Sequence, residues 1–371
     1  MRLLVLAHTP PPVHGQSLMV RTLVEGLPAV APGIKLHHVN LRLSRDAADI
    51  GRWRPTKLLA LFVACGRALW LRARHGPMTL YYVPAPAKRA ALYRDFLVML
   101  LCRPFFSRLV LHWHAVGLGE WLATQASAFE RGLATRLLGR ADLAIVLATD
   151  LAADAAFLQP KRVEIVPNGL DSDPAADAAP RARRRDDAPT EILFLGLCTR
   201  EKGVFDTLTA LAIANRREPG AFRLTVAGEF ASVRDQHAFF SQVDALGREA
   251  VRHVGFVDDT RKHALLSSAD VLCFPSFYPH EGQPLVLIEA LAHDLPIVTT
   301  RWRALPGLLP REHVQLVDPA RPDQIADALL AVRRSTRPAG ELRAYYNAHY
   351  SCARHLALLA NCLRSLEPAR A

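Results

Sequence analysis

The segment HEGQPLVLIEALAHDLPIVTT spans residues 280–300 and carries more information than any other part of the chain. Two carboxylates, Glu281 and Glu289, lie eight positions apart across a Gly-x-Pro turn and the start of an apolar helix. Pro284 suits the first position of that helix, and Gly282 lets the backbone approach a ligand closely. The free N–H groups at the helix start favour an anion. Because Glu281 lies in the loop and Glu289 a turn or more into the helix, they suit two hydroxyl-bearing parts of one extended ligand.

The two glutamates could be ordinary solvated charges on a helix. The residues before this segment make that interpretation less favoured, because an apolar strand and Pro275-Ser276 lead into it. The combined pattern resembles the signature of the family-4 retaining glycosyltransferases, also called glycosyl transferases group 1, which have the GT-B fold. The residues that carry the resemblance are Pro275, Ser276, Glu281, Gly282, Pro284, Glu289, Ala290, Ala292 and Pro296. One position departs from the pattern: the usual Gly before Leu-Pro is Asp294, and Asp adopts the left-handed conformation more readily than most residues.

The resemblance implies a division of labour between the two glutamates. Glu289 holds the ribose of a nucleotide, and Glu281, together with the amides that follow it, holds the donor sugar. The backbone that follows Glu281 completes this site, through Gly282, Gln283 and Pro284. The loop Gly255-Phe256-Val257-Asp258 resembles the loop whose backbone reads the nucleotide base, which adds Val257 to the donor-binding residues.

A cation is needed beside the leaving group, because breaking the bond between a sugar and a nucleoside diphosphate builds negative charge on the phosphate. Many glycosyltransferases hold a metal ion with Asp-x-Asp, but the chain has no convincing site of that kind, so we expect no metal. Residues 194–204, FLGLCTREKGV, resemble the family motif Gly-Arg-Leu-x-x-Glu-Lys-Gly, whose Arg and Lys grip the diphosphate. Gly196 and Lys202 match this motif. Leu197 replaces the Arg, and Arg200 is the candidate for the second cation.

The N-terminal loop is a second place where backbone amides meet an anion, because it joins an apolar strand to a helix. This loop contains Pro11, Pro12 and Gly15, where the family often has Pro-Pro-x-x-Gly-Gly. The resemblance therefore assigns Gly15 to the donor-binding residues. The fingerprint GxGxxG is absent, so a dinucleotide site is not supported.

The sequence His112-Trp-His114 ends another apolar strand, and strand alternation places both imidazoles on one face. A third ligand is not evident, which disfavours a zinc site. In the family a His at this strand end lies beside the donor sugar, and His114, followed by Ala-Val-Gly117, is the better match. A hydrogen-bonded His at the strand end is the alternative.

Strands alternate with helices in two successive halves, which predicts two α/β domains with parallel sheets. The expected strands span residues 3–7, 80–83, 108–113, 143–148, 163–167, 192–195, 223–227, 251–255, 271–274, 297–300 and 313–317. We expect an acceptor-side Rossmann-like domain over residues 1–171, a linker over 172–190 and a nucleotide-sugar domain over 191–345. A C-terminal helix within residues 346–371 should pack back toward the first domain. The resemblance implies that the two doubly wound domains face each other across a cleft.

The composition is that of a globular protein with room for two domains. Of 371 residues, 50% are hydrophobic and 22% are charged. The first apolar run, Leu3 to Ala7, is too short for the core of a signal peptide, and no stretch reaches the roughly 18 apolar residues of a membrane span. Six scattered cysteines without a CxxC pair are typical of buried thiols in a reducing compartment. We therefore expect a cytoplasmic protein.

The net charge of +11 is concentrated in the first half, where residues 1–170 carry 21 Lys and Arg against 10 Asp and Glu. Within residues 51–110, 11 basic residues meet one acid, Asp95. Basic residues surround apolar runs in residues 51–75 and again in residues 88–108, which predicts peripheral binding to an anionic membrane at the inner face of the plasma membrane. Two core helices with solvated arginines are the alternative.

Motifs and resemblance together predict a metal-independent glycosyltransferase that takes a nucleotide diphosphate sugar and needs no cofactor, and the resemblance implies that it is retaining. The expected acceptor is a glycan or a lipid-linked molecule of cell-envelope polysaccharide or glycolipid synthesis. A GT-B nucleotide-sugar epimerase is the alternative enzyme. A non-catalytic nucleic-acid-binding protein is more remote, because aliphatic residues rather than base-stacking aromatics lie between the basic residues.

Overall fold

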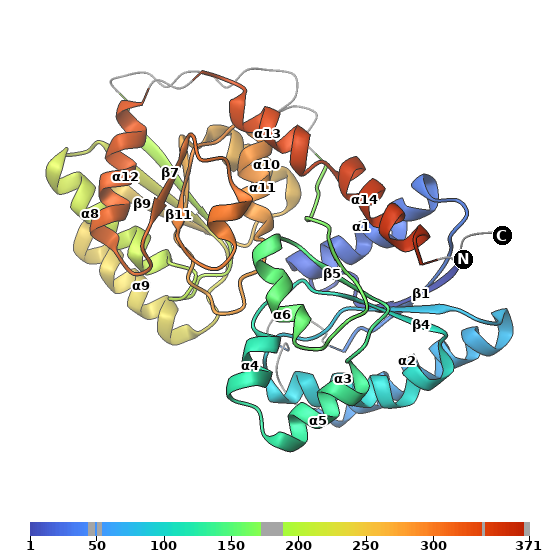
Figure 1. Cartoon of the computed structure of the whole chain (residues 1–371). Coiled ribbons are helices and arrows are strands. Elements are labelled where there is room, and N and C mark those ends of the chain that lie inside the picture. Colours follow the sequence, from blue (N-terminus) through green and yellow to red (C-terminus); the bar gives the residue numbers. More distant parts are fainter. Residues whose placement is uncertain (44–48, 50–53, 172–187, 336–337, 367–371) are drawn as a thin grey trace. The chain divides into compact units, whose positions relative to one another are not determined.

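The computed structural model describes residues 1–43, 49, 54–171, 188–335 and 338–366 (Figure 1). The chain forms two compact units. Unit 1 contains Met1–Gly169 and Cys352–Ala371, and unit 2 contains Leu170–Ser351. Most of the predicted linker, residues 172–187, lies outside the described residues.

Unit 1 is an α/β unit around a parallel sheet of six strands in the order β2-β1-β3-β4-β5-β6. Its elements are β1 (Arg2–Ala7), α1 (Gly15–Val30), β2 (Lys35–Asn40), α2 (Pro55–His75), β3 (Thr79–Tyr82), α3 (Arg89–Cys102), η2 (Arg103–Phe105), β4 (Arg108–His112), α4 (Leu118–Thr124), α5 (Ala128–Leu137), β5 (Leu143–Val146), η3 (Thr149–Leu151), α6 (Ala152–Ala156), β6 (Val163–Ile165) and α14 (Cys352–Arg364). The central strands are buried on both faces, which explains their unbroken apolar sequences.

Helix α14 returns to unit 1 and packs beside α1 (Figure 1). Leu359 and Leu363 of α14 belong to the same buried cluster as Leu23 and Leu27 of α1. Gly26 makes room for this contact, because a Cβ built on it would lie 2.5 Å from a methyl group of Leu356. The C-terminal helix is thus part of the core of unit 1.

Unit 2 repeats the plan with a parallel sheet in the order β12-β11-β10-β7-β8-β9. Its elements are β7 (Thr190–Leu195), α8 (Val204–Arg217), β8 (Phe222–Ala227), α9 (Val233–Leu246), η4 (Arg248–Ala250), β9 (Val251–Gly255), α10 (Asp259–Ser268), β10 (Val271–Phe274), α11 (Leu285–Ala292), β11 (Ile297–Thr300), η5 (Leu305–Leu308), β12 (Val314–Val317), α12 (Pro322–Arg334) and α13 (Glu341–His349). Strand order reverses beside β7 and β10, and ligands of such sheets bind at the carboxyl ends of strands near this point.

The predicted fold class, two doubly wound α/β sheets of the GT-B type, is confirmed. Strand β2 was missing from the predicted set. Pro284 is the residue before α11 and not its first residue, so the prediction for that helix start was wrong by one position. Within the described part of the chain, no helix is both long and apolar enough to cross a membrane.

Candidate functional site

Glu281 lies in the loop between β10 and α11, where its side chain is almost fully buried, with 6% of the residue exposed. Its Oε2 accepts a hydrogen bond of 2.6 Å from Ser276 Oγ. Lys202 Nζ approaches the same oxygen at 2.7 Å. The motif residues Gly282 and Pro284 are buried beside it. The carboxylate is therefore held from two directions through Oε2, and among the described residues no hydrogen bond or ion pair involves Oε1.

Lys202 is brought to Glu281 by the turn between β7 and α8. Gly203 caps α8 in the left-handed conformation, with φ 84°, and a Cβ on it would lie 2.4 Å from the Pro275 carbonyl oxygen. This close approach puts the start of α8 directly against the end of β10. Lys202 Nζ also lies 4.9 Å from the centre of the Tyr278 ring, a cation–π distance.

Glu289 has a cationic partner that the motifs did not predict. Lys262, in the first turn of α10, approaches Glu289 Oε1 at 2.7 Å and Asp259 Oδ1 at 2.8 Å. Burial lowers the pKa of Lys262, but Glu289 and Asp259 raise it by more, so the ammonium stays charged. The sequence signal is Asp258-Asp259 followed by a lysine one turn into a helix, which is too common to single out.

The other donor-binding candidates of unit 2 lie at the same edge of its sheet. Gly196 follows β7, and Val257 lies in the loop between β9 and α10. Arg200 does not join Lys202, because its Nε pairs with Asp235 Oδ1 at 3.4 Å and its guanidinium stacks on Phe205 at 4.3 Å. Gln283, in the loop before α11, is buried.

The candidates Gly15 and His114 belong to unit 1 and lie at the carboxyl ends of β1 and β4. Gly15 is the first residue of α1, whose capping box is formed by His14 and Ser17. The ring of His114 lies 4.2 Å from that of His112. Burial, with smaller effects of His355 and His14, lowers the pKa of His114 to about 3. The imidazole is therefore neutral near pH 7 and can exchange hydrogen bonds with a hydroxyl group.

Asp294, which replaces the usual family glycine, adopts a left-handed φ of 52°. Its buried carboxylate accepts hydrogen bonds from the backbone N–H groups of Gly340 at 2.8 Å and Leu342 at 3.0 Å. These are free donors at the start of α13, so Asp294 stabilises that helix. The departure from the motif supplies a helix cap and leaves the turn intact.

The match to a known protein family lies in unit 2. Residues 189–334 match the family described as Glycosyl transferases group 1. The chain is 38% identical to a glycogen synthase of Mycobacterium tuberculosis over 138 residues, which cover 37% of this chain and 31% of that protein. It is 32% identical to a phosphatidyl-myo-inositol mannosyltransferase of Mycobacterium leprae over 178 residues, covering 46% and 44%. The chain thus spans less than half the length of these relatives.

Solved structures match over the whole chain. A sucrose-phosphate synthase from Thermosynechococcus elongatus has a TM-score of 0.74 at 20% identity and covers 99% of both chains. The trehalose-6-phosphate synthase OtsA has a TM-score of 0.70 at 13% identity and covers 98% of both chains. At these identities the likeness concerns the fold. Unit 2 therefore contains the region that matches glycosyl transferases group 1, and the chain as a whole has the GT-B fold.

Proposed function

We propose that the chain is a retaining glycosyltransferase that transfers a hexosyl group from a nucleotide diphosphate sugar without a metal ion. The observation that carries this proposal is the pair of Lys202 and Glu281, held at 2.7 Å at the carboxyl edge of the sheet of unit 2. A cation fixed in this way can stabilise the departing diphosphate. Its side chain is already ordered by folding, so it does not have to reorganise when the reaction occurs. Retention is proposed from the family match of residues 189–334.

Each charged residue has a separate task in this proposal. Lys202 binds the diphosphate, Glu281 orients Lys202 and accepts a hydrogen bond from a sugar hydroxyl, and Glu289 binds the ribose. The backbone around Gly282 and Val257 completes contacts to sugar and base. His114, neutral near pH 7, is proposed to contact a sugar hydroxyl. The leaving phosphate assists deprotonation of the acceptor, which then attacks from the same face.

The proposed acceptor is a glycan or a lipid-linked molecule of the cell envelope. This proposal is supported by the relatives, which include a glycogen synthase and phosphatidyl-myo-inositol mannosyltransferases, each similar over part of its length. The basic half of the chain, residues 1–170, fits an anionic acceptor or surface.

A donor screen followed by a release assay tests this function. Thermal shifts with UDP-, GDP- and ADP-sugars identify the donor, because a ligand at 100 times its dissociation constant adds about 2.7 kcal/mol of stability. The selected donor is then incubated with lipid and glycan fractions of bacterial envelopes, with and without EDTA. Nucleoside diphosphate released only with an acceptor, and equally with EDTA, supports the proposal. If the sugar is altered in the absence of an acceptor, whether or not it is still attached to the nucleotide, the protein is an epimerase instead.

Glu289→Ala is expected to weaken binding of the bare nucleoside diphosphate by about ten- to a hundredfold, since losing a charge-assisted hydrogen bond costs roughly 1.5–3 kcal/mol. Glu281→Gln should leave that binding nearly unchanged and reduce discrimination between donor sugars. Asp259→Asn is the matched control, because it removes the other partner of Lys262 while Glu289 stays. Calorimetric titration with nucleotide and with donor measures both. Equal effects of the two glutamate variants on both ligands would contradict the division of labour.

The surface proposed to contact the membrane is one exposed stripe of α2. Its large apolar side chains recur at helical spacing and are exposed: Leu58, Leu59, Phe62, Val63 and Trp70. Arg67 and Arg74 are exposed beside them, and the Arg74 guanidinium lies 6.0 Å from the centre of the Trp70 ring. An apolar stripe flanked by cations is typical of a helix that lies in an anionic interface. We call this stripe with its two arginines the α2 surface.

Other basic residues predicted for this role are engaged inside unit 1. Lys57 Nζ approaches Asp49 Oδ1 at 3.2 Å, and Arg54 pairs with the same carboxylate. Arg52 and Trp53 lie outside the described residues. In the second predicted patch, around residues 96–102, Phe96, Met99 and Cys102 are buried and Leu100 is exposed, so the described residues offer less apolar surface there than on α2. Two cations of that patch are engaged, since Arg94 pairs with buried Asp95 at 2.7 Å and Arg103 binds backbone carbonyls.

The double variant Arg67→Glu/Arg74→Glu is expected to bind anionic vesicles at least about 30-fold more weakly, because each basic residue near such a surface contributes about 1 kcal/mol. Phe62→Ser/Val63→Ser should weaken binding to the same vesicles with less dependence on salt. Phe129→Ser, an exposed aromatic of α5, is the matched control. Co-sedimentation with phosphatidylglycerol and phosphatidylcholine vesicles at two salt concentrations measures binding. Binding that ignores lipid charge, salt and these variants would rule out the α2 surface.

A further inference from the structure

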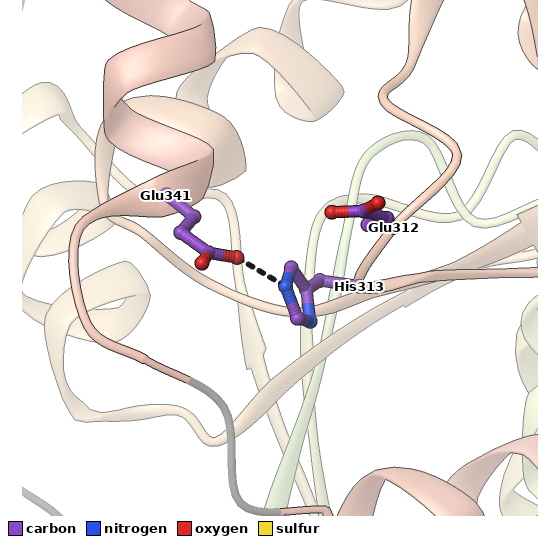
Figure 2. Close-up of side chains that lie close together, drawn as sticks. All are labelled: Glu312, His313 and Glu341. Atoms are coloured by element: carbon purple, nitrogen blue, oxygen red, sulfur yellow. Dashed lines mark ion pairs between the residues drawn. The ribbon is translucent and has the colours of Figure 1, made fainter.

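Three side chains that commonly bind metal ions lie together in unit 2 (Figure 2). Glu312 and His313 immediately precede β12, and Glu341 is the first residue of α13. One carboxylate oxygen of each glutamate and an imidazole nitrogen of His313 all lie within 4.8 Å of one another. Figure 2 shows Glu341 reaching His313 from its helix, with the Glu312 carboxylate nearby. His313 Nε2 contacts Glu341 Oε2.

We propose that Glu312, His313 and Glu341 bind one divalent transition-metal ion, with Zn²⁺ as the reference ion. One imidazole and two carboxylates are a mixed nitrogen and oxygen donor set, which suits Zn²⁺ and its neighbours better than Mg²⁺ or Ca²⁺. Zinc bonds of about 2.0–2.2 Å place the ligand atoms of a tetrahedron about 3.4 Å apart. Pairs of atoms at the limit of 4.8 Å therefore need to approach by about 1.4 Å. Both glutamates are exposed, so side-chain rotation can supply this movement.

The electrostatics of the cluster favour a cation. The two carboxylates contribute two negative charges, and among the described residues no ion pair links Glu312 to a basic side chain. The contact between His313 and Glu341 places two of the ligands beside each other, and bonds to the metal ion would replace this contact.

The position of the cluster separates this site from sugar transfer. Because Glu312 and His313 precede β12, they lie at the amino edge of the parallel sheet, whereas the donor-binding residues follow the carboxyl ends of its strands. The same amino edge holds Asp294, which caps α13 and precedes β11. A metal ion bound by residues before β12 and at the start of α13 would therefore join these two elements. The expected role is to stabilise unit 2, and it does not depend on the proposed transferase activity.

Metal titration of the full chain tests the site. After treatment with EDTA and its removal, the chain should bind one Zn²⁺, and the melting temperature should rise with Zn²⁺ concentration. Glu312→Gln is the diagnostic variant, because it removes one ligand and keeps the contact of His313 with Glu341. We expect it to lower Zn²⁺ affinity by about tenfold or more while its melting temperature in EDTA stays that of the unchanged chain. His313→Ala should abolish binding, and His237→Ala, an exposed histidine of α9, should not affect it.

Cobalt distinguishes this site from the cysteines. Co²⁺ bound through nitrogen and oxygen gives visible absorption without the intense ultraviolet charge-transfer band of a thiolate, and the spectrum should disappear in His313→Ala. The proposal is overturned if Zn²⁺ binds the Glu312→Gln chain as tightly as the unchanged chain, if the cobalt spectrum reports thiolates, or if no Zn²⁺ binds. Donor turnover below the melting temperature should be the same with EDTA and with Zn²⁺, so this result and the transferase assay fail independently.

Discussion

Lys202→Ala is expected to lower turnover by about a hundredfold or more, because one preorganised group facing a developing charge contributes that much to catalysis. Its partner complicates the experiment. Glu281 is buried and shares a 2.7 Å contact with Lys202, so removal of the lysine leaves a buried carboxylate that still accepts the hydrogen bond of Ser276 but has lost its cation. Breaking a buried ion pair costs up to about 3–5 kcal/mol, and the partial exposure of Lys202 reduces this value. Loss of activity could then follow from loss of stability.

The double variant Lys202→Ala/Glu281→Gln separates these two effects. A neutral amide removes the uncompensated charge, so the double variant should be more stable than Lys202→Ala alone, with a coupling of about 0.5–3 kcal/mol. Its turnover should nevertheless stay at least a hundredfold down, because the diphosphate still lacks its cation. Chemical unfolding and initial rates measure the two quantities. If turnover in the double variant recovers with stability, Lys202 serves the fold and its proposed catalytic role is wrong.

The arrangement of each sheet could be predicted from the sequence because buried parallel strands leave a simple signal. Runs such as Leu3–Leu6 are apolar on both faces, and short polar segments separate them from helices. Strand β2 left no such signal. Its sequence, KLHHVN, is polar and mostly half-exposed, because it forms the edge of its sheet beside β1. This segment is a strand because it pairs with its neighbour in the sheet, and its own residues do not indicate that pairing.

The residues of the candidate site could be proposed from the sequence, but the contacts between them could not. The motif indicated Glu281, Glu289 and Lys202 separately, whereas their ion pairs join residues from different loops. Lys202 and Glu281 are 79 positions apart and meet because two strands end side by side. Lys262 was missed for the same reason, since only the folded structure shows that this residue of α10 pairs with Glu289 of α11. Asp294 departs from the motif, and its side chain accepts a hydrogen bond from Gly340, which lies 46 positions away in the sequence.

Gly203→Ala should be among the most damaging small substitutions in unit 2, because two independent costs coincide at this residue. The backbone has φ 84°, and a left-handed conformation costs roughly 1–2 kcal/mol for a residue with a Cβ. The new methyl group would also lie 2.4 Å from the Pro275 carbonyl oxygen, which is backbone and cannot rotate away. Overpacking of this kind adds about 1–3 kcal/mol. We therefore expect a total destabilisation of about 2–5 kcal/mol.

Gly220→Ala isolates the first cost, because Gly220 has φ 70° and a Cβ added there would meet no atom within 4 Å. It should lose about 1–2 kcal/mol and keep full activity. In Gly203→Ala the start of α8 must move away from the end of β10, which shifts Lys202 relative to Glu281. A displacement of about 1 Å at a catalytic group can lower the rate about a hundredfold. Urea unfolding and turnover of both variants are the measurements. If the two alanine variants behave alike, close packing at Gly203 does not position Lys202.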